Sequence, residues 1–249
     1  MKLKVISFNI RYCDDKDGHS IKERAPRLLE VTKKYDADII GFQEFTPPWE
    51  KEIPNLYPEY DMFMLYRSKS ELEAAPILWK RDKFELLDKG NFWLSDTPEV
   101  ESRGWDALYN CWRMCEYVIL KHKETGKLIT HMNTHYGFGD KGQVDSSKLM
   151  YEYSKKISSN PTFLTGDFNM RPDSAGYKEM VKHFTDVNGA TANDRRTTYH
   201  GYGKVNDEHI DYCFINEKIK PVSLKLIDEL VDGKYPSDHY GLFVELDVQ

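Results

Sequence analysis

Short apolar runs recur along the chain and predict β-strands. Nine of them have the length of a strand and are rich in β-branched and aromatic residues: residues 2–8, 38–43, 60–66, 76–80, 115–121, 128–134, 161–166, 210–215 and 240–246. Turn-forming residues bound these runs, as they usually bound strands in a globular protein. We therefore expect nine or more strands.

Three stretches between these runs follow the spacing of an amphipathic helix: residues 22–35, 145–159 and 174–184. In each, apolar side chains recur every three or four positions and so share one face. Pro26 is expected in the first turn of the first helix, where a missing N–H costs little. Asp173 or Ser174 is expected to cap the third helix.

The number and order of these elements narrow the fold class. So many strands with so few helices do not fit a doubly wound parallel sheet, and the alternation of helices with strands does not fit an all-β sandwich. Two sheets packed face to face, with helices outside, agree best with the pattern. No Ser/Gly linker or internal repeat interrupts the 249 residues, which predicts a single domain over residues 1–249.

Composition limits the partners. Hydrophobic residues make up 40% of the chain and charged residues 31%, as in ordinary globular proteins. The net charge is -6 and no basic run is present, which argues against a protein that holds long duplex DNA through its phosphates alone. A clustered patch or a bound metal ion can still supply positive charge for one phosphate.

The cysteines and the first residues indicate a cellular compartment. Cys13, Cys111, Cys115 and Cys213 form no CxxC pair and no zinc-binding spacing, so we expect reduced thiols. The N-terminal apolar run is too short for a secretory signal, and no segment approaches a membrane span. We therefore expect a cytoplasmic protein without a membrane or an obligate protein partner.

Polar side chains stand at the ends of six predicted strands: Asn9, Gln43 with Glu44, Asn133 with His135, Asp167 with Asn169, Asp211, and Asp238 with His239. Each one alone is typical of a turn or a cap. Six mixtures of carboxylates, amides and histidines together favour a site assembled from strand ends.

The stretch "LTGDFNMRP" contains two of these residues, Asp167 and Asn169. Residues two apart on an extended segment point to the same face, so both side chains are expected to converge while Phe168 faces the core. The alternative is an Asx-type turn without chemistry, because Asp and Asn often form such turns.

The residue types favour metal chemistry over a protein nucleophile. Carboxylate and amide oxygens suit Mg²⁺ or Mn²⁺ better than zinc, and Glu44 is the best single candidate ligand. The histidines then remain for proton transfer or charge stabilisation. No GxSxG motif is present, and the cysteines lie in apolar runs where an inert thiol is expected.

Taken in order, these motifs resemble the endonuclease/exonuclease/phosphatase family of DNase I-like, metal-dependent phosphoesterases. They read "SFNIRY", "GFQE", "NTHYG", "GDFN", "HIDYCF" and "SDHYGL" and extend from the first strand to the last. "FWLSDTPE", "GWDA" and "TTYHGYG" are similar to a bacterial subgroup related to the carbon catabolite repressor proteins. The resemblance implies a four-layer αββα sandwich with two mixed sheets.

The resemblance also implies a metal site. Glu44 would bind the divalent cation, Mg²⁺ or alternatively Mn²⁺, with Asn9 beside it. Asp238 would lie close to the metal.

The implied catalytic residues are Asp167, Asn169, His135, Asp211 and His239. Asp167 would orient or deprotonate the attacking water, and Asn169 would hold the phosphate and the nucleophile. His135 would donate a hydrogen bond to a phosphate oxygen. Asp211 would orient His239 and favour its charged form. Whether His239 acts as acid, base or charge clamp stays open.

Departures from the subgroup pattern concern the substrate pocket. An Asp-His pair commonly follows the position of His135, where this chain has Tyr136 and Gly137, and "CTWA" is replaced by "CWRM", which places Arg113 near the expected site. Arg11 and Arg113 are candidate phosphate anchors, because arginine matches phosphate oxygens bidentately, and structural ion pairs are the alternative.

Four further side chains are candidates for a stacking wall against a base or sugar, with ordinary core packing as the alternative: Trp105, Tyr199, His200 and Tyr202.

The expected function is a metal-dependent phosphoester hydrolase that acts by in-line attack of water, with a phosphodiesterase or nuclease as the first interpretation. The first alternative is a phosphomonoesterase that acts on a small sugar, nucleotide or lipid phosphate. The second alternative is a catalytically inactive module that binds phosphate and interacts with a partner. The expected partner is a phosphoester substrate, whether nucleic acid, nucleotide or small phosphate ester. The acidic net charge favours a small or short one.

Overall fold

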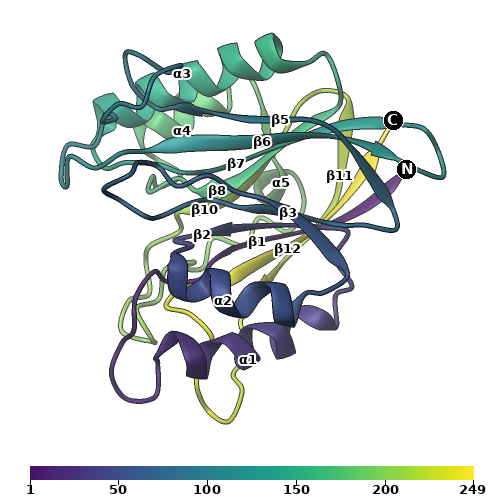
Figure 1. The fold of residues 1–249 in the computed structure, drawn as a ribbon. Helices are drawn as coiled ribbons and strands as arrows, with labels where there is room; N and C mark the ends of the chain where they lie inside the picture. Colours follow the sequence, from purple (N-terminus) through teal and green to yellow (C-terminus); the bar gives the residue numbers. More distant parts are fainter.

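Two mixed six-stranded β-sheets lie face to face at the centre of the fold (Figure 1). The computed structural model describes residues 1–249. The first sheet has, in spatial order, β11 (Ile219–Ile227), β12 (Gly241–Val248), β1 (Lys2–Asn9), β2 (Ile39–Gln43), β4 (Ile77–Lys80) and β3 (Tyr60–Phe63). The second has β5 (Phe84–Trp93), β6 (Met114–His122), β7 (Leu128–His135), β8 (Thr162–Asp167), β10 (Asp211–Ile215) and β9 (Thr185–Asp186).

Helices form the two outer layers. In Figure 1, α1 (Ile21–Lys33) and α2 (Pro47–Leu56) cover the first sheet, and α3 (Asp140–Ile157) and α4 (Ala175–Met180) cover the second. The short α5 (Val187–Ala190) follows β9. Three apolar clusters separate the four layers: one between the sheets, one under α1 and α2, and one under α3 and α4. The fold is therefore the expected four-layer αββα sandwich.

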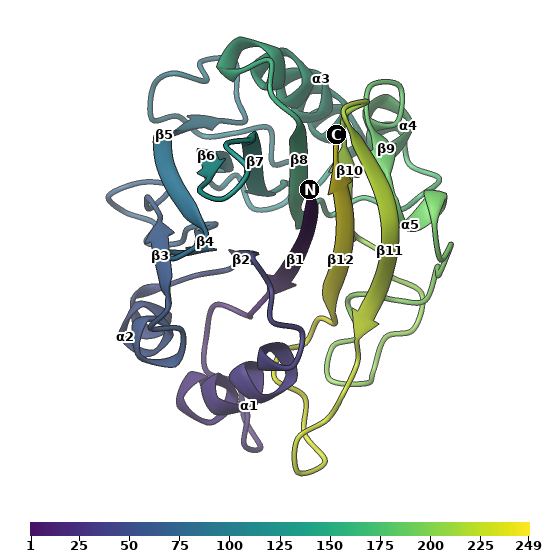
Figure 2. The same ribbon diagram turned by 90° about the vertical axis from the view of Figure 1, so that its right-hand side faces the viewer.

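The strand register brings the functional strand ends to one edge. β1 and β2 run parallel, so that Asn9 pairs with Gln43, and β7 and β8 run parallel, so that His135 pairs with Asp167. β10 runs antiparallel to β8, and its first residue, Asp211, pairs with Asp167. The two termini lie close together at the start of β1 and the end of β12 (Figure 2), away from the ends of β1, β2, β7 and β8.

The apolar runs predicted the interior strands well. Each of the nine expected strands is present, while β5, β9 and β11 were not expected. All three are edge strands of their sheets. In β5 and β11, an irregular mixture of buried and exposed positions replaces the continuous apolar run of an interior strand.

The helices differ from the prediction at their first turns. α1 begins at Ile21, with Ser20 and Glu23 forming a capping box. Pro26 therefore lies in the second turn of α1, and the prediction that it lies in the first turn was wrong. α3 begins at Asp140, a turn before the predicted start. Ser174 caps α4 through the backbone N–H of Tyr177. No helix combines the length and the apolar character needed to cross a membrane.

Candidate active site

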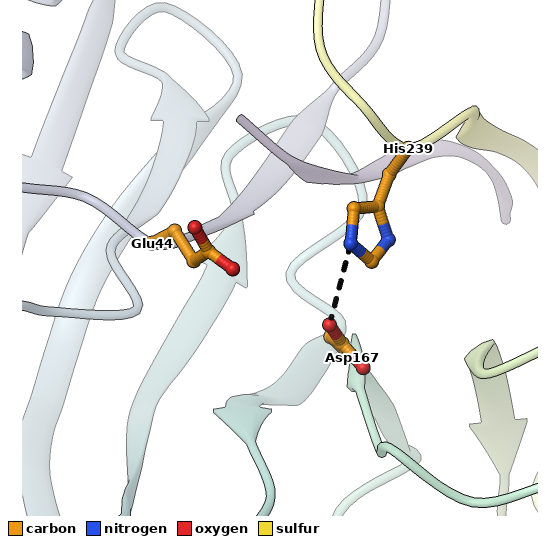
Figure 3. A group of neighbouring side chains, drawn as sticks. All are labelled: Glu44, Asp167 and His239. Carbon is orange, nitrogen blue, oxygen red and sulfur yellow. Dashed lines mark ion pairs between the residues drawn. The ribbon is translucent and has the colours of Figure 1, made fainter. Parts of the chain in front are cut away.

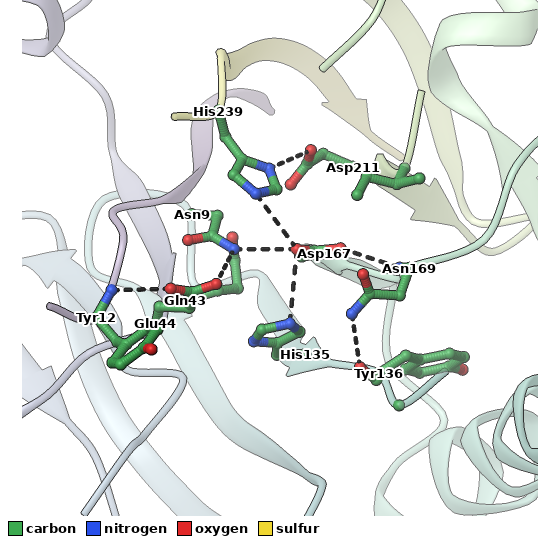
Figure 4. Close-up of polar contacts among 12 residues, drawn as sticks. Asn9, Tyr12, Gln43, Glu44, His135, Tyr136, Asp167, Asn169, Asp211 and His239 are labelled. Carbon is green, nitrogen blue, oxygen red and sulfur yellow. Dashed lines mark hydrogen bonds and ion pairs between the residues drawn. The ribbon is translucent and has the colours of Figure 1, made fainter. Parts of the chain in front are cut away.

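A cavity of about 1360 Å³ opens where the strand ends of both sheets meet. The side chains that converge on it come from β7, β8 and the loops that follow β1, β2 and precede β12. Asp167, the last residue of β8, lies at the centre of the polar contacts (Figure 4). Three of the predicted catalytic residues, His135, Asn169 and His239, line the cavity with it.

Asp167 and Asn169 are brought together by a turn and not by an extended pleat. The Asn169 backbone N–H donates to Asp167 Oδ1 at 2.9 Å, which is an Asx-type turn, and Asn169 has a left-handed backbone (φ 49°). The Asn169 Nδ2 donates to the carbonyl oxygen of Tyr136 at 2.9 Å. Phe168 points away into the apolar cluster under α3, as expected. The two alternatives considered for this stretch therefore coexist: the turn aims both side chains at the cavity.

Burial and neighbouring charge change the basicity of Asp167. Its carboxylate is 2% exposed and accepts a hydrogen bond from Asn9 Nδ2 at 3.0 Å. Burial, followed by the charge of Asp211, raises the pKa of Asp167 to about 7, although His239 and the hydrogen bonds act in the opposite direction. A carboxylate with a pKa near neutrality is suited to accept a proton at physiological pH.

His239 is fixed by Asp211 and faces Asp167. His239 Nδ1 lies 2.9 Å from Asp211 Oδ2, and Nε2 lies 3.8 Å from Asp167 Oδ2. Burial alone would lower the pKa of His239, but the charge and hydrogen bond of Asp211, with the charges of Asp167 and Asp238, raise it to about 10. His239 is therefore an imidazolium at neutral pH, suited to stabilise negative charge and not to accept a proton.

His135, unlike His239, is held in its neutral form. Its Nε2 lies 3.6 Å from Asp167 Oδ2, and its Nδ1 lies 3.4 Å from Glu73. Burial, with the charges of Arg113 and Arg67, holds the pKa of His135 well below its ordinary value. The ring is neutral at physiological pH and offers one N–H donor to a ligand in the cavity.

Glu44 follows β2 and supplies a carboxylate to the same edge. It has a left-handed backbone (φ 61°), Oε1 accepts from Asn9 Nδ2 at 3.0 Å, and Oε2 accepts from the Tyr12 backbone N–H at 2.8 Å. Glu44, Asp167 and His239 offer ligand atoms within 4.8 Å of one another (Figure 3). The carboxylates of Glu44 and Asp167 fit a hard divalent cation held mainly by Glu44, whereas His239 in its charged form is not a metal ligand.

The other two expected metal-site residues lie nearby in different roles. Asn9 directs its amide nitrogen to both Glu44 and Asp167, so it positions the two carboxylates in this arrangement. Asp238 is buried and lines the cavity, and its Oδ2 lies 3.6 Å from Arg11 Nε. Burial, with the charge of Glu44, raises the pKa of Asp238 above its ordinary value, against the charges of His239 and Arg11.

The candidate substrate residues separate into two groups. Arg11, Arg113 and Tyr199 line the cavity. Trp105 does not; it packs at the edge of the apolar cluster under α3 and donates to Asp96 at 3.2 Å. His200 is 1% exposed and stacks on Tyr240, outside the cavity lining, because apolar contacts and burial hold its ring in the interior.

Tyr202 also lies outside the cavity lining. It donates to Asp15 Oδ2 at 2.9 Å and stacks against His19.

Several site residues were not singled out from the sequence. Arg67, Glu73 and Tyr109 line the cavity from loops with no regular pattern. Arg24 is fully buried in α1, and its guanidinium donates to the carbonyl oxygens of Ile10, Arg11, Cys13 and His19, which holds the loop between Asn9 and α1. The signal for Arg24 was present: it lies four residues before Leu28, on the apolar face of its helix.

Comparison with known proteins identifies the family of the chain. The family model described as "Endonuclease/Exonuclease/phosphatase family" matches residues 6–239. An endonuclease/exonuclease/phosphatase family protein of Bacteroides thetaiotaomicron is 29% identical, with a TM-score of 0.91 over 100% of this chain and 98% of that chain. The mannosyl-6-phosphatase of the same organism is 29% identical, with a TM-score of 0.89 over 98% and 99% of the two chains.

One relative is named as an exoribonuclease. The CCR4-Not complex 3'-5'-exoribonuclease subunit Ccr4 of Aspergillus niger is 21% identical over 91% of this chain and 47% of its own length. The chain thus spans about half of that relative. Because the family model covers nearly the whole chain and the family fold is reproduced in full, the protein belongs to the endonuclease/exonuclease/phosphatase family.

Proposed function

We propose that the protein is a metal-dependent hydrolase of a phosphoester, in which water attacks the phosphorus in line with the leaving oxygen. The observation that carries the proposal is the arrangement around Asp167. A buried carboxylate with a pKa of about 7 lies between a neutral histidine, His135, and a charged one, His239. A base and two donors around one point of a cavity are the groups that phosphoryl transfer to water requires.

Each residue then has a distinct task. Asp167 accepts a proton from the attacking water as the new P–O bond forms and the bond to the leaving oxygen breaks. Asn169 and His135 hold phosphoryl oxygens through their N–H groups, and His239, kept charged by Asp211, stabilises the growing negative charge. The displaced oxygen takes up a proton from solvent and leaves as an alcohol, and Asp167 releases its proton to solvent.

Glu44 is the residue proposed to hold a divalent cation, with Asn9 and Asp238 arranged beside it. Such a cation neutralises phosphate charge and stabilises the leaving oxygen when bound. Mg²⁺ is the preferred ion for a site with few protein carboxylates, and Mn²⁺ is the alternative.

The experiment compares Asp167→Asn and His239→Ala with two controls, Asp82→Asn and His122→Ala, which line a separate cavity at the other end of the strands. Released phosphate or nitrophenol is measured with p-nitrophenyl phosphate and bis(p-nitrophenyl) phosphate in the presence of Mg²⁺. The two site variants are expected to lose on the order of 10²–10⁴-fold in kcat, and the controls to keep it. Equal turnover in all five proteins would refute the proposal.

The inactive interaction module makes a different prediction. It requires phosphate or metal binding without turnover of any phosphoester. Isothermal calorimetry with Mg²⁺ and Mn²⁺ on the wild type and Glu44→Gln, beside the activity assay, separates the two. Metal binding that depends on Glu44 but supports no hydrolysis would favour the module.

A further inference from the structure

The charges that line the cavity are unusual for a protein that binds a polyanion. The lining contains four arginines, Arg11, Arg67, Arg113 and Arg171, and no lysine. Each is already in an ion pair within the protein: with Asp15, Glu71, Asp106 and Glu208, respectively. A polynucleotide is bound largely by free Lys and Arg on its successive phosphates, whereas every arginine of this lining already faces a carboxylate.

Carboxylates outnumber arginines in the same lining, eight to four. Two of them, Asp140 and Asp173, are exposed at the mouth, at the starts of α3 and α4. Phosphates that flank the reacting one in a diester chain would meet these carboxylates within a Debye length. The two carboxylates at the entrance therefore disfavour a chain of phosphates more than they disfavour a single phosphate.

The inner end of the cavity is built for one phosphate. Arg113 is 6% exposed, and its Nη1 is buried without a hydrogen-bond partner. Nε of the same guanidinium is held by Asp106 Oδ2 at 3.1 Å, which fixes the plane of the group. An unsatisfied guanidinium nitrogen beside His135 is a site for an anionic oxygen.

The mouth also carries an apolar surface. Tyr12, Leu72, Tyr109 and Phe138 come from four separate loops and line the cavity; we call them the rim. Tyr109 is 66% exposed and packs edge-on against Phe138, with ring centroids 5.5 Å apart. Its backbone N–H donates to Asp106 Oδ1 at 2.8 Å, so the carboxylate that orients Arg113 also positions Tyr109. Exposed aromatic side chains held this firmly indicate a surface prepared for a ligand.

We propose that the rim binds the neutral, hydroxyl-bearing ring of a small phosphomonoester, so that the substrate class is a sugar phosphate and not a polynucleotide. This inference rests on the proposed function. Tyr109 and Phe138 cover a C–H face of the ring, while Asp140 and Asp173 accept hydrogen bonds from its hydroxyl groups. Water adds to phosphorus, the bond from phosphorus to the sugar oxygen breaks, that oxygen takes up a proton, and the products are inorganic phosphate and the free sugar.

The first experiment is a substrate panel for the wild type with Mg²⁺: a hexose 6-phosphate, glycerol 3-phosphate, a nucleoside 5'-monophosphate, bis(p-nitrophenyl) phosphate and a single-stranded oligonucleotide. The hexose phosphate is expected to have the highest kcat/KM. Preference for the nucleotide, the diester or the oligonucleotide would overturn this inference while the proposed hydrolase function stands. No turnover of any member would instead refute the proposed function.

The second experiment separates the rim from the catalytic groups. Tyr109→Ala is expected to raise KM for the hexose phosphate about five- to tenfold with little change in kcat, and Tyr109→Phe to keep both. Neither change should affect glycerol 3-phosphate, which is too short to need the rim. Val222→Ala, at another exposed apolar position on the edge strand β11, is the control. An unchanged KM for the hexose phosphate in Tyr109→Ala would overturn the role of the rim.

Discussion

Glu116 is a carboxyl group buried between the two sheets, and its replacement by glutamine tests how the fold tolerates it. The side chain is 0% exposed; its Oε1 accepts the backbone N–H of Ala75 at 3.0 Å, and Oε2 has no partner. No cation pairs with it among its recorded contacts. Burial therefore raises its pKa from the ordinary 4.5 to about 8, so Glu116 is protonated in the folded protein at neutral pH.

This difference makes stability depend on pH with a defined sign. Below pH 4.5 the carboxyl is protonated in both the folded and unfolded states. Between pH 4.5 and about 8 the unfolded chain releases the proton while the folded chain keeps it, so the free energy of unfolding falls as the pH rises. Above about pH 8 the loss levels off. A pKa difference of this size corresponds to at most about 5 kcal/mol.

Glu116→Gln keeps the acceptor for Ala75 and the side-chain volume but cannot ionise. The stability of the variant relative to the wild type is therefore expected to increase steadily from pH 5 to pH 8. Urea unfolding followed by tryptophan fluorescence at several pH values measures this difference. Glu85→Gln, at an exposed position on β5, is the control and should show a flat difference. A difference that stays constant, or that grows toward low pH, would refute the assignment of a buried neutral carboxyl.

Further predictions concern the site and the loop beneath it. Asp211→Asn removes the leading cause of the raised pKa of His239, so kcat should fall about 100-fold and its alkaline limb should move to lower pH; an unmoved limb in a pH–rate profile would contradict this. Chelation with EDTA should abolish turnover and added Mg²⁺ or Mn²⁺ should restore it, whereas full activity in EDTA would exclude the metal. Arg24→Lys loses most of four carbonyl contacts and should lower the unfolding free energy by roughly 3 kcal/mol, measured by urea denaturation beside the exposed control Arg81→Lys; a loss below about 1 kcal/mol would contradict this.

The interior strands could be predicted because their surroundings are uniform. β1, β2, β8 and β12 are packed on at least one face by a sheet or a helix, and a continuous or alternating apolar run is the direct result. β5 and β11 lie at sheet edges, each with a break in register, so exposure varies along them and the pattern weakens. α2 was missed as well, since three prolines and a short apolar face hide its period.

Some residues of the candidate site could be named from the sequence, and others could be placed only by the structure. Residue types and order were sufficient to name Glu44, Asp167 and His239, because strand ends in a sheet fold collect functional side chains and these three share the cavity. His200 and Trp105 have the same aromatic character as Tyr109, and nothing in their local sequence separates them. Only packing places the first two against the core and the third at the cavity mouth.

The turn at Asp167 and Asn169 shows the boundary between the two kinds of information. The sequence by itself determined that an acid and an amide follow an apolar strand, and hence that a turn or a site was present, because both depend on local chemistry. Their convergence with His239, which precedes β12 of the other sheet, was decided only by the tertiary structure. So was the pKa of Asp167, because burial and the charge of Asp211 arise from residues far away in the chain, and no local pattern records which distant groups will share a low-dielectric space.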